Sequence, residues 1–137
     1  VNEATYKSGK ITPSVKVSAN GYRLPKNAEW EFAARGGIKT IGYTASGSDD
    51  ANTVGWFVEN SGLNIHPVGG LKPNELGIYD MSGNVEEWCF EGENPISNFT
   101  RGGTYISGPD AGFNQSSTAN YVRDTLRGFR VALSSAP

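Results

Sequence analysis

The residues with the clearest chemical potential lie in one short stretch, Gly77-Ile78-Tyr79-Asp80-Met81-Ser82-Gly83-Asn84-Val85-Glu86-Glu87-Trp88. Its carboxylates Asp80 and Glu87 are separated by seven positions and flank a Ser-Gly-Asn turn. Calcium binds carboxylate and backbone carbonyl oxygens together, and a tight turn can direct several carbonyls to one side. The stretch therefore predicts a cation site. The alternative is a metal-free turn whose carboxylates cap it and pair with arginine.

A short helix over residues 26–35 is predicted to support this turn. Trp30, Ala33 and Ala34 fall on one helical face, and Gly36 with the following glycine ends the helix. Lys26 stands at the expected start, and Asn27 is expected to provide the cap one residue later.

The rest of the chain is expected to form short strands and long loops. A strand–turn–strand unit is predicted over 78–88, and further strands over 100–106 and 128–133, in one small antiparallel sheet. The last of these alternates Phe129, Val131 and Leu133. Residues 38–75 are expected to form a long loop, ordered by apolar content only around 54–58, and residues 1–20 an irregular lead-in. We predict a single domain over 1–137.

The composition of the chain limits the kinds of molecule that it is expected to bind. The net charge is −2 with no cluster of lysine or arginine, which argues against nucleic acid. No apolar run reaches membrane-spanning length. The single cysteine, Cys89, rules out an internal disulfide.

Four segments, in order, resemble one known family. They are Gly21-Tyr22-Arg23-Leu24-Pro25 leading into Glu29-Trp30-Glu31-Phe32-Ala33-Ala34-Arg35-Gly36-Gly37, the stretch from Gly77 to Trp88, Arg101-Gly102-Gly103-Thr104, and Arg127-Gly128-Phe129-Arg130-Val131-Ala132. Together they resemble the formylglycine-generating-enzyme (sulfatase-modifying factor) family. That resemblance implies an α+β, C-type-lectin-like fold that is rich in loops. It covers residues 21–133 and begins mid-domain, so the chain is expected to be the C-terminal part of a full domain, with the missing N-terminal part as one partner.

The resemblance also implies a set of calcium ligands in the stretch from Gly77 to Trp88, which we call the signature turn. They would be the Asp80 side chain, the carbonyls of Gly83 and Val85, and the Glu87 side chain. One departure stands out, because the family usually has tryptophan where this chain has Glu86. We expect Glu86 to point to solvent, since an unpaired buried carboxylate is costly.

The catalytic residues of the resembling enzymes are missing. Those enzymes use a cysteine pair between the Arg-Gly-Gly and Gly-Phe-Arg motifs, and residues 104–127 contain no cysteine. Iron-dependent relatives use three histidines, whereas His66 is the single histidine of this chain. We therefore predict a non-enzymatic protein. The alternative is a formylglycine-generating oxidase or a related metal-dependent enzyme.

Residues 105–126 form the candidate ligand-binding segment. A non-catalytic branch of the family consists of variable proteins of diversity-generating retroelements, whose adenine mutagenesis yields no Lys, Glu, Gln, Met or Trp. Only Gln115 of this interval belongs to that set. Aromatic and short polar side chains suit adaptable binding of an unknown protein or small ligand. The predicted ligand-binding residues are Tyr105, Ser107, Asp110, Phe113, Asn114, Asn120, Tyr121 and Asp124, while Ile106 and Val122 are expected in the core. A bacterial cell-surface or extracellular location is expected; an ordinary polar loop is the alternative.

Overall fold

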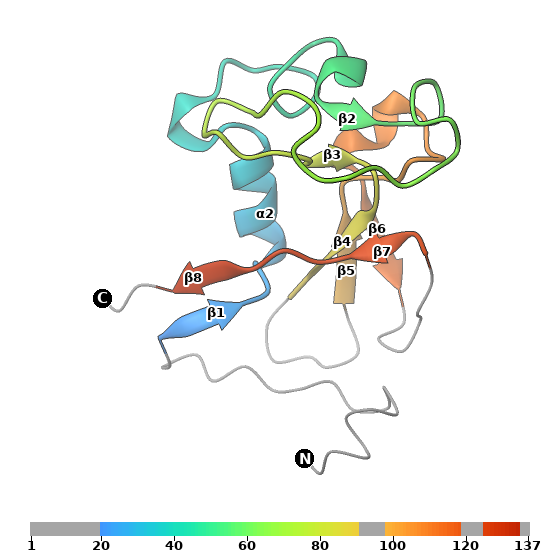
Figure 1. Cartoon of the computed structure of the whole chain (residues 1–137). Helices are drawn as coiled ribbons and strands as arrows, with labels where there is room; N and C mark the ends of the chain where they lie inside the picture. The colour runs from blue at the N-terminus through green and yellow to red at the C-terminus, as the bar shows by residue number, and fades with distance from the viewer. Residues whose placement is uncertain (1–19, 91–97, 119–124, 135–137) are drawn as a thin grey trace, which may run out of the picture.

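The computed structural model describes residues 20–90, 98–118 and 125–134 (Figure 1). Its one α-helix in these ranges is α2 (Asn27–Ala34). Short 3-10 turns are η1 (Gly37–Lys39), η2 (Ala51–Thr53) and η3 (Pro109–Phe113). The strands are β1 (Gly21–Arg23), β2 (Gly55–Trp56), β3 (Ser82–Gly83), β4 (Glu86–Cys89), β5 (Asn98–Arg101), β6 (Gln115–Thr118), β7 (Arg127–Gly128) and β8 (Ala132–Ser134). The predicted α+β, loop-rich architecture with one short helix is confirmed.

The strands form three small sheets rather than the single antiparallel sheet predicted. The largest has the order β6-β5-β4-β7, in which β7 runs parallel to β4 and the other pairs are antiparallel. Strands β2 and β3 pair in parallel, and β1 pairs antiparallel with β8. The strand predicted over 100–106 was wrong beyond Arg101, because Gly102 and Gly103 have φ of 101° and 70° and turn the chain away.

Helix α2 lies between the sheets and buries one face. Trp30 and Ala34 are 1% and 0% exposed, as the spacing predicted. The backbone N–H of Lys26 donates to the Glu29 carboxylate at 2.8 Å, which fixes the first turn. Asn27 as the cap was wrong: Lys26 is the cap residue, and the Asn27 side chain bonds across to β5 and β6 instead.

The core joins the helix to the signature turn and to β4. Trp30, Ala34, Met81 and Cys89 form one buried cluster, with Ala33, Ile78, Phe99 and Phe113 packed against it. Val54 and Phe57, which belong to the 38–75 region, are also buried. Ile106, expected in the core, is 47% exposed, and that prediction was wrong. Val122 lies outside the described residues.

Glu86 also departs from its prediction. Its side chain is 17% exposed rather than directed to solvent. The hydroxyls of Thr100 and Ser116 donate to it at 2.8 and 3.2 Å, and Arg127 lies 3.6 Å away. Neighbouring strands thus supply the partners that make partial burial of this carboxylate tolerable. In the described part of the chain, no helix is long and apolar enough to cross a membrane.

Candidate ligand-binding face

Arg101, the arginine of the Arg-Gly-Gly motif, ties the helix to the candidate segment. It is 6% exposed and donates through Nη1 to the Phe113 carbonyl at 3.0 Å. Its Nη2 donates to the Glu31 carboxylate at 2.9 Å, and its Nε donates to the Asn27 side chain. These charge-assisted bonds fix η3 against α2, so the segment after Arg101 is held on a rigid base.

Arg130, the arginine of the Gly-Phe-Arg motif, performs the same task on the signature turn. Its Nη2 donates to Glu87 Oε1 at 2.6 Å, and its Nε donates to Oε2. Trp30 Nε1 donates to the same Oε2 at 2.7 Å. Arg130 also donates to the carbonyls of Tyr79 and Asp80, each at 3.1 Å. The carboxylate of Glu87, whose residue is 8% exposed, is therefore held by a cation of the protein itself.

The signature turn is built from residues with unusual backbone angles. Asp80, Gly83 and Asn84 have φ of 56°, 72° and 63°. A Cβ at Gly83 would lie 2.3 Å from the Trp56 carbonyl oxygen, so only glycine fits. The Asn84 side chain accepts from the backbone N–H of His66 and donates to its carbonyl, and the Asn84 carbonyl accepts from the N–H of Tyr105. One asparagine thus joins the long loop to the candidate segment.

The four predicted calcium ligands lie in this turn, but their carboxylates already have protein partners. Both oxygens of Glu87 accept hydrogen bonds, as described above. Asp80 Oδ2 accepts from the Gly69 N–H at 2.6 Å. The described residues contain no group of three or more His, Cys, Asp or Glu side chains placed to hold a metal. Calcium would therefore have to compete with Arg130 for Glu87, and binding of calcium with the Gly83 and Val85 carbonyls stays a prediction.

The described members of the predicted ligand set divide into two groups. Asp110 and Asn114 are exposed, and their side chains are available to a partner. Phe113 instead packs on the core and lies under the Arg35 guanidinium, 4.4 Å from its ring centre. The Ser107 hydroxyl accepts from the Thr104 N–H at 3.1 Å and stabilises a turn.

Tyr105 is half-buried, and its carbonyl accepts from the Ser61 hydroxyl at 2.7 Å. The remaining predicted ligand residues, Asn120, Tyr121 and Asp124, lie outside the described residues. Sequence reasoning missed Ile106, which stands beside Tyr105 and is 47% exposed.

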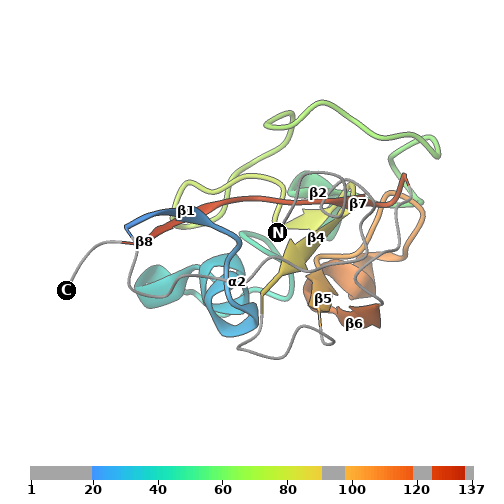
Figure 2. The ribbon, with the colours of Figure 1, turned by 90° about the horizontal axis from the view of Figure 1, so that it is seen from below.

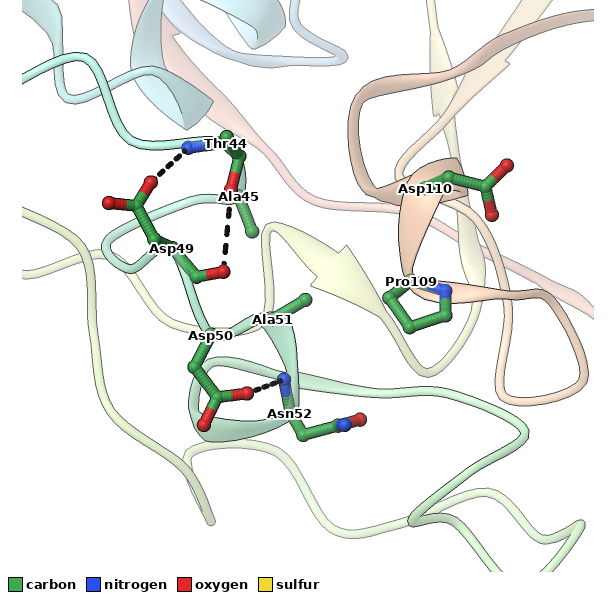
Figure 3. Close-up of a pocket in the computed structure, with 8 residues that line it drawn as sticks. All are labelled: Thr44, Ala45, Asp49, Asp50, Ala51, Asn52, Pro109 and Asp110. Atoms are coloured by element: carbon green, nitrogen blue, oxygen red, sulfur yellow. Dashed lines mark hydrogen bonds between the residues drawn. The ribbon is translucent and has the colours of Figure 1, made fainter.

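A pocket of about 330 Å³ adjoins the exposed part of this segment (Figure 3). Its lining comes from two loops that are distant in sequence: Thr44, Ala45, Asp49, Asp50, Ala51 and Asn52 on one side, Pro109 and Asp110 on the other. Figure 3 shows Ala45, Ala51 and Pro109 around the central space and the carboxylates toward the rim. Sequence reasoning predicted Asp110 but not the facing loop, which carries no recognisable motif.

The rim carboxylates of the 44–52 loop are structural as well as charged. Asp49 accepts from the Thr44 N–H at 3.0 Å, and Asp50 caps η2 by accepting from the Asn52 N–H at 3.2 Å. They fix the loop while leaving negative charge at the opening. This electrostatic environment favours a neutral or cationic group over an anion.

Cys89 is 1% exposed and lies in the core next to Met81 and Trp30. Its thiol lies 3.8 Å from the Glu87 carbonyl oxygen. A buried thiol of this kind behaves as a small apolar side chain. Cys89 therefore belongs to the apolar core and not to the exposed surface around the pocket.

Comparison with known proteins places this geometry in a family. The sulfatase-modifying factor enzyme 1-like domain matches residues 3–135. A chaperone protein LppX of Paenibacillus barcinonensis is 46% identical over 99 residues, covering 60% of this chain and 35% of that protein. An inactive C-alpha-formylglycine-generating enzyme 2 of Bos taurus is 31% identical over 133 residues, covering 82% of this chain and 44% of that protein.

Among solved structures, Treponema denticola variable protein 1 matches with a TM-score of 0.77 at 30% identity. The match covers 90% of this chain and 51% of that one. The chain thus spans about half or less of the length of these relatives. With the family match over nearly all its residues and the same fold in the treponemal protein, the chain belongs to the sulfatase-modifying factor enzyme 1-like domain family, in its C-type-lectin-like fold.

Proposed function

We propose that this chain is a non-enzymatic ligand-binding module, a variable protein of a diversity-generating retroelement or a similar surface receptor. The observation that supports it best is the similarity to Treponema denticola variable protein 1, combined with exposed side chains on a rigid base. Asp110 and Asn114 are exposed, while Arg101, which donates to the carbonyl of Phe113 beside Asn114, is buried and multiply bonded. A surface of this kind can change its side chains without changing its scaffold.

The binding face in this proposal consists of Ile106, Asp110 and Asn114 with the adjoining pocket. The ligand is a protein or a small molecule that presents a neutral or cationic group to the pocket rim. Display at a bacterial cell surface belongs to the same proposal, because a diversified binding face is useful where it meets external partners.

Two matched libraries test the ligand-binding role. In the first library, positions 106, 110 and 114 are randomised. In the second library, the buried positions Thr100, Gly102 and Thr104 are randomised. Both are displayed on yeast, scored for resistance to protease, and sorted for binding to hen lysozyme as a test ligand. We expect the first library to stay largely folded and to yield binders, and the second to lose folding. Equal loss of folding in both libraries would reject the proposed face.

A second test addresses the retroelement itself. The coding DNA should be accompanied by a near-copy of the segment for residues 101–133 that differs mainly at adenines, next to a reverse transcriptase gene. Without such a near-copy the ligand-binding module could still stand, but the retroelement origin would be rejected.

A second candidate, binding of another protein chain as a helper, is favoured by the 46% identity to a protein named as a chaperone.

The enzymatic alternative is tested by incubating the chain with a cysteine-containing sulfatase peptide and copper. Mass spectrometry is expected to show unchanged peptide, because the one cysteine is buried and copper(I) needs soft ligands held close together. Formation of formylglycine would overturn the non-enzymatic proposal.

A further inference from the structure

The pocket between the 44–52 loop and η3 is lined by side chains that mainly accept hydrogen bonds. Asp49 and Asp50 carry carboxylates and Asn52 an amide, and none of the described lining residues is cationic. The Oδ1 atom of Asn52 is buried and has no hydrogen-bond partner in the described part of the chain. Figure 3 shows this amide extending from η2 toward the Pro109 side of the pocket. A buried acceptor without a donor is uncommon and unfavourable, so an occupant that donates hydrogen bonds fits this lining.

The two loop carboxylates favour one kind of cationic donor. Oδ1 of Asp49 accepts from the Thr44 N–H at 3.0 Å, and Oδ1 of Asp50 accepts from the Asn52 N–H at 3.2 Å. Each carboxylate therefore has one oxygen occupied by the loop and one oxygen open to an occupant. A guanidinium binds best as a fork to both oxygens of one carboxylate. An ammonium group donates three separate bonds and can reach single oxygens of different residues, as these aspartates offer.

The rest of the lining suits the stem of such a side chain. Ala45, Ala51 and Pro109 surround the central space, and small apolar walls of this kind can pack on methylene groups (Figure 3). Figure 3 shows the carboxylate of Asp110 directed away from the 44–52 loop. Asp110 therefore adds negative charge at the opening, where it attracts a cation without bonding to it.

Two exposed apolar side chains lie beside the pocket. Val58 and Ile106, which we call the apolar pair, are 44% and 47% exposed. The Val58 N–H donates at 3.0 Å to the carbonyl of Ser107, the neighbour of Ile106. Asn52 Nδ2 donates at 3.0 Å to the Glu59 carboxylate, which ties the pocket wall to the residue after Val58. A small free amine would leave the apolar pair in water, whereas an apolar residue next to a lysine in a protein ligand would cover it.

We propose that the pocket is a lysine subsite, which takes a lysine side chain of a protein ligand while an adjacent apolar residue of that ligand packs on the apolar pair. The ammonium group donates to the open oxygens of Asp49 and Asp50 and to Asn52 Oδ1. The 44–52 loop lies outside the candidate segment 105–126, so the subsite stays constant while that segment varies. This inference rests on the proposed ligand-binding function and adds the chemistry by which the ligand is held.

Three small probes test the subsite by nuclear magnetic resonance on the full, ¹⁵N-labelled chain. They are n-butylammonium, n-butylguanidinium and n-butanol, and the backbone amides of residues 44–52 report binding. We expect saturable shifts with n-butylammonium at a Kd in the millimolar range, because a probe of about five non-hydrogen atoms can contribute little more. n-Butylguanidinium should bind at least about threefold more weakly, and n-butanol should give no saturable shift at the same concentrations.

Single charge-removing variants locate the binding. Asp49→Asn and Asp50→Asn should each weaken n-butylammonium at least about threefold, since the new amide oxygen can still hold the loop but carries no charge. Glu59→Gln is the matched control, because it removes a nearby carboxylate that does not line the pocket. It should change the affinity less than about twofold. The probe series on the unaltered chain needs no variant, so it decides even where a variant fails to fold.

A peptide distinguishes a protein ligand from a small amine. The blocked peptide acetyl-Gly-Lys-Ile-Gly-amide should bind at least about fivefold more tightly than n-butylammonium, because its isoleucine covers the apolar pair. Val58→Ser with Ile106→Ser should remove this gain and leave the n-butylammonium affinity unchanged. Val131→Ser with Leu133→Ser is the matched control and should keep the gain. These residues are 52% and 65% exposed, and Figures 1 and 2 show β8 on the side of the molecule opposite η3.

The possible failures are distinguishable. Absence of saturable shifts with n-butylammonium, or equal binding of n-butylguanidinium or n-butanol, would overturn the lysine subsite. A peptide that binds no more tightly than the amine, or a gain that does not depend on the apolar pair, would overturn the protein ligand. Binders from the library at positions 106, 110 and 114 would still support the proposed function in either case. Amine binding at 44–52 together with a library that does not fold would instead reject the proposed face and retain the pocket.

Discussion

Replacing Arg130 by methionine should be among the most damaging single changes outside the apolar core. Methionine keeps much of the side-chain volume but removes the guanidinium that holds Glu87. The carboxylate would keep only the bond from Trp30 Nε1 at 2.7 Å. The Tyr79 and Asp80 carbonyls would also lose a donor.

The magnitude follows from burial. Removing one partner of a buried ion pair destabilises a protein by roughly 3–5 kcal/mol, because a charge is left without compensation. The Arg130 side chain is 26% exposed and the Glu87 side chain 10%, so water can re-enter partly. We therefore expect a loss of about 2–4 kcal/mol in the free energy of unfolding.

Glu87→Gln should be milder, with a loss of about 1–2 kcal/mol, because the amide oxygen can still accept a hydrogen bond. The double variant should be less destabilised than the sum of the single variants by about 1.5–3 kcal/mol, since the two residues interact directly.

Urea unfolding followed by tryptophan fluorescence gives these free energies in a double-mutant cycle. Arg35→Met is the matched control: its partner Glu31 lies 2.9 Å away, but the two side chains are 51% and 36% exposed. An exposed pair of this kind contributes at most about 1 kcal/mol. If Arg130→Met were no worse than Arg35→Met, the ion pair would not support the turn as argued.

The remaining predictions concern the metal, the binding face, a glycine and pH. At a calcium concentration ten times the Kd, calcium should add about 1.4 kcal/mol to the free energy of unfolding and so raise the melting temperature relative to chelator. Glu87→Ala should abolish this rise, and no rise in the unaltered chain would contradict the calcium site. Asp110→Ala and Asn114→Ala should change the unfolding free energy by less than about 0.5 kcal/mol, measured in urea, because both side chains are exposed. Gly83→Ala should lower stability by more than about 2 kcal/mol, since its Cβ would meet the Trp56 carbonyl at 2.3 Å; a mild effect in urea unfolding would show that the turn can adjust. The Arg35 hydrogen bond, assisted by Arg101, lowers the pKa of Glu31 below its usual 4.5, so the stability from this group is present above pH 4.5 and is lost as the pH falls through the lowered pKa. Acid titration of melting temperature should show this loss in the unaltered chain and a weaker one in Glu31→Gln.

The helix and its buried face could be predicted because the signals are local. Trp30 and Ala34 repeat with the helical period, and Gly36 ends the helix with φ of 84°. The end of this strand at Arg101 could not be predicted from local signals. Gly102 and Gly103 turn the chain out of the strand, and at Gly103 the backbone passes so close to Ala111 that a Cβ would lie 2.9 Å from that side chain. That contact comes from tertiary packing, and no local pattern reports it.

Side chains with distant partners were predicted least well. Glu86 was expected in solvent because an unpaired buried carboxylate is costly, yet Thr100 and Ser116 donate to it from adjoining strands. Phe113 was expected on the binding face because it is aromatic and lies in a polar segment. It packs under Arg35 and on the core instead. In both cases strand pairing or the position of α2 decides the environment.

The same reasoning explains why the recognisable motifs identify the family more readily than the activity. Arg101 and Arg130 are the arginines of two motifs, and each binds at least one backbone carbonyl and a glutamate of the scaffold. Gly83 is required by a close backbone approach rather than by a ligand. Residues of this kind serve the scaffold, and a scaffold of one fold can carry an enzyme or a binding protein. In the proposed function, binding depends on positions that the scaffold leaves free, and Asp110 and Asn114 are two exposed positions of this kind on the described surface.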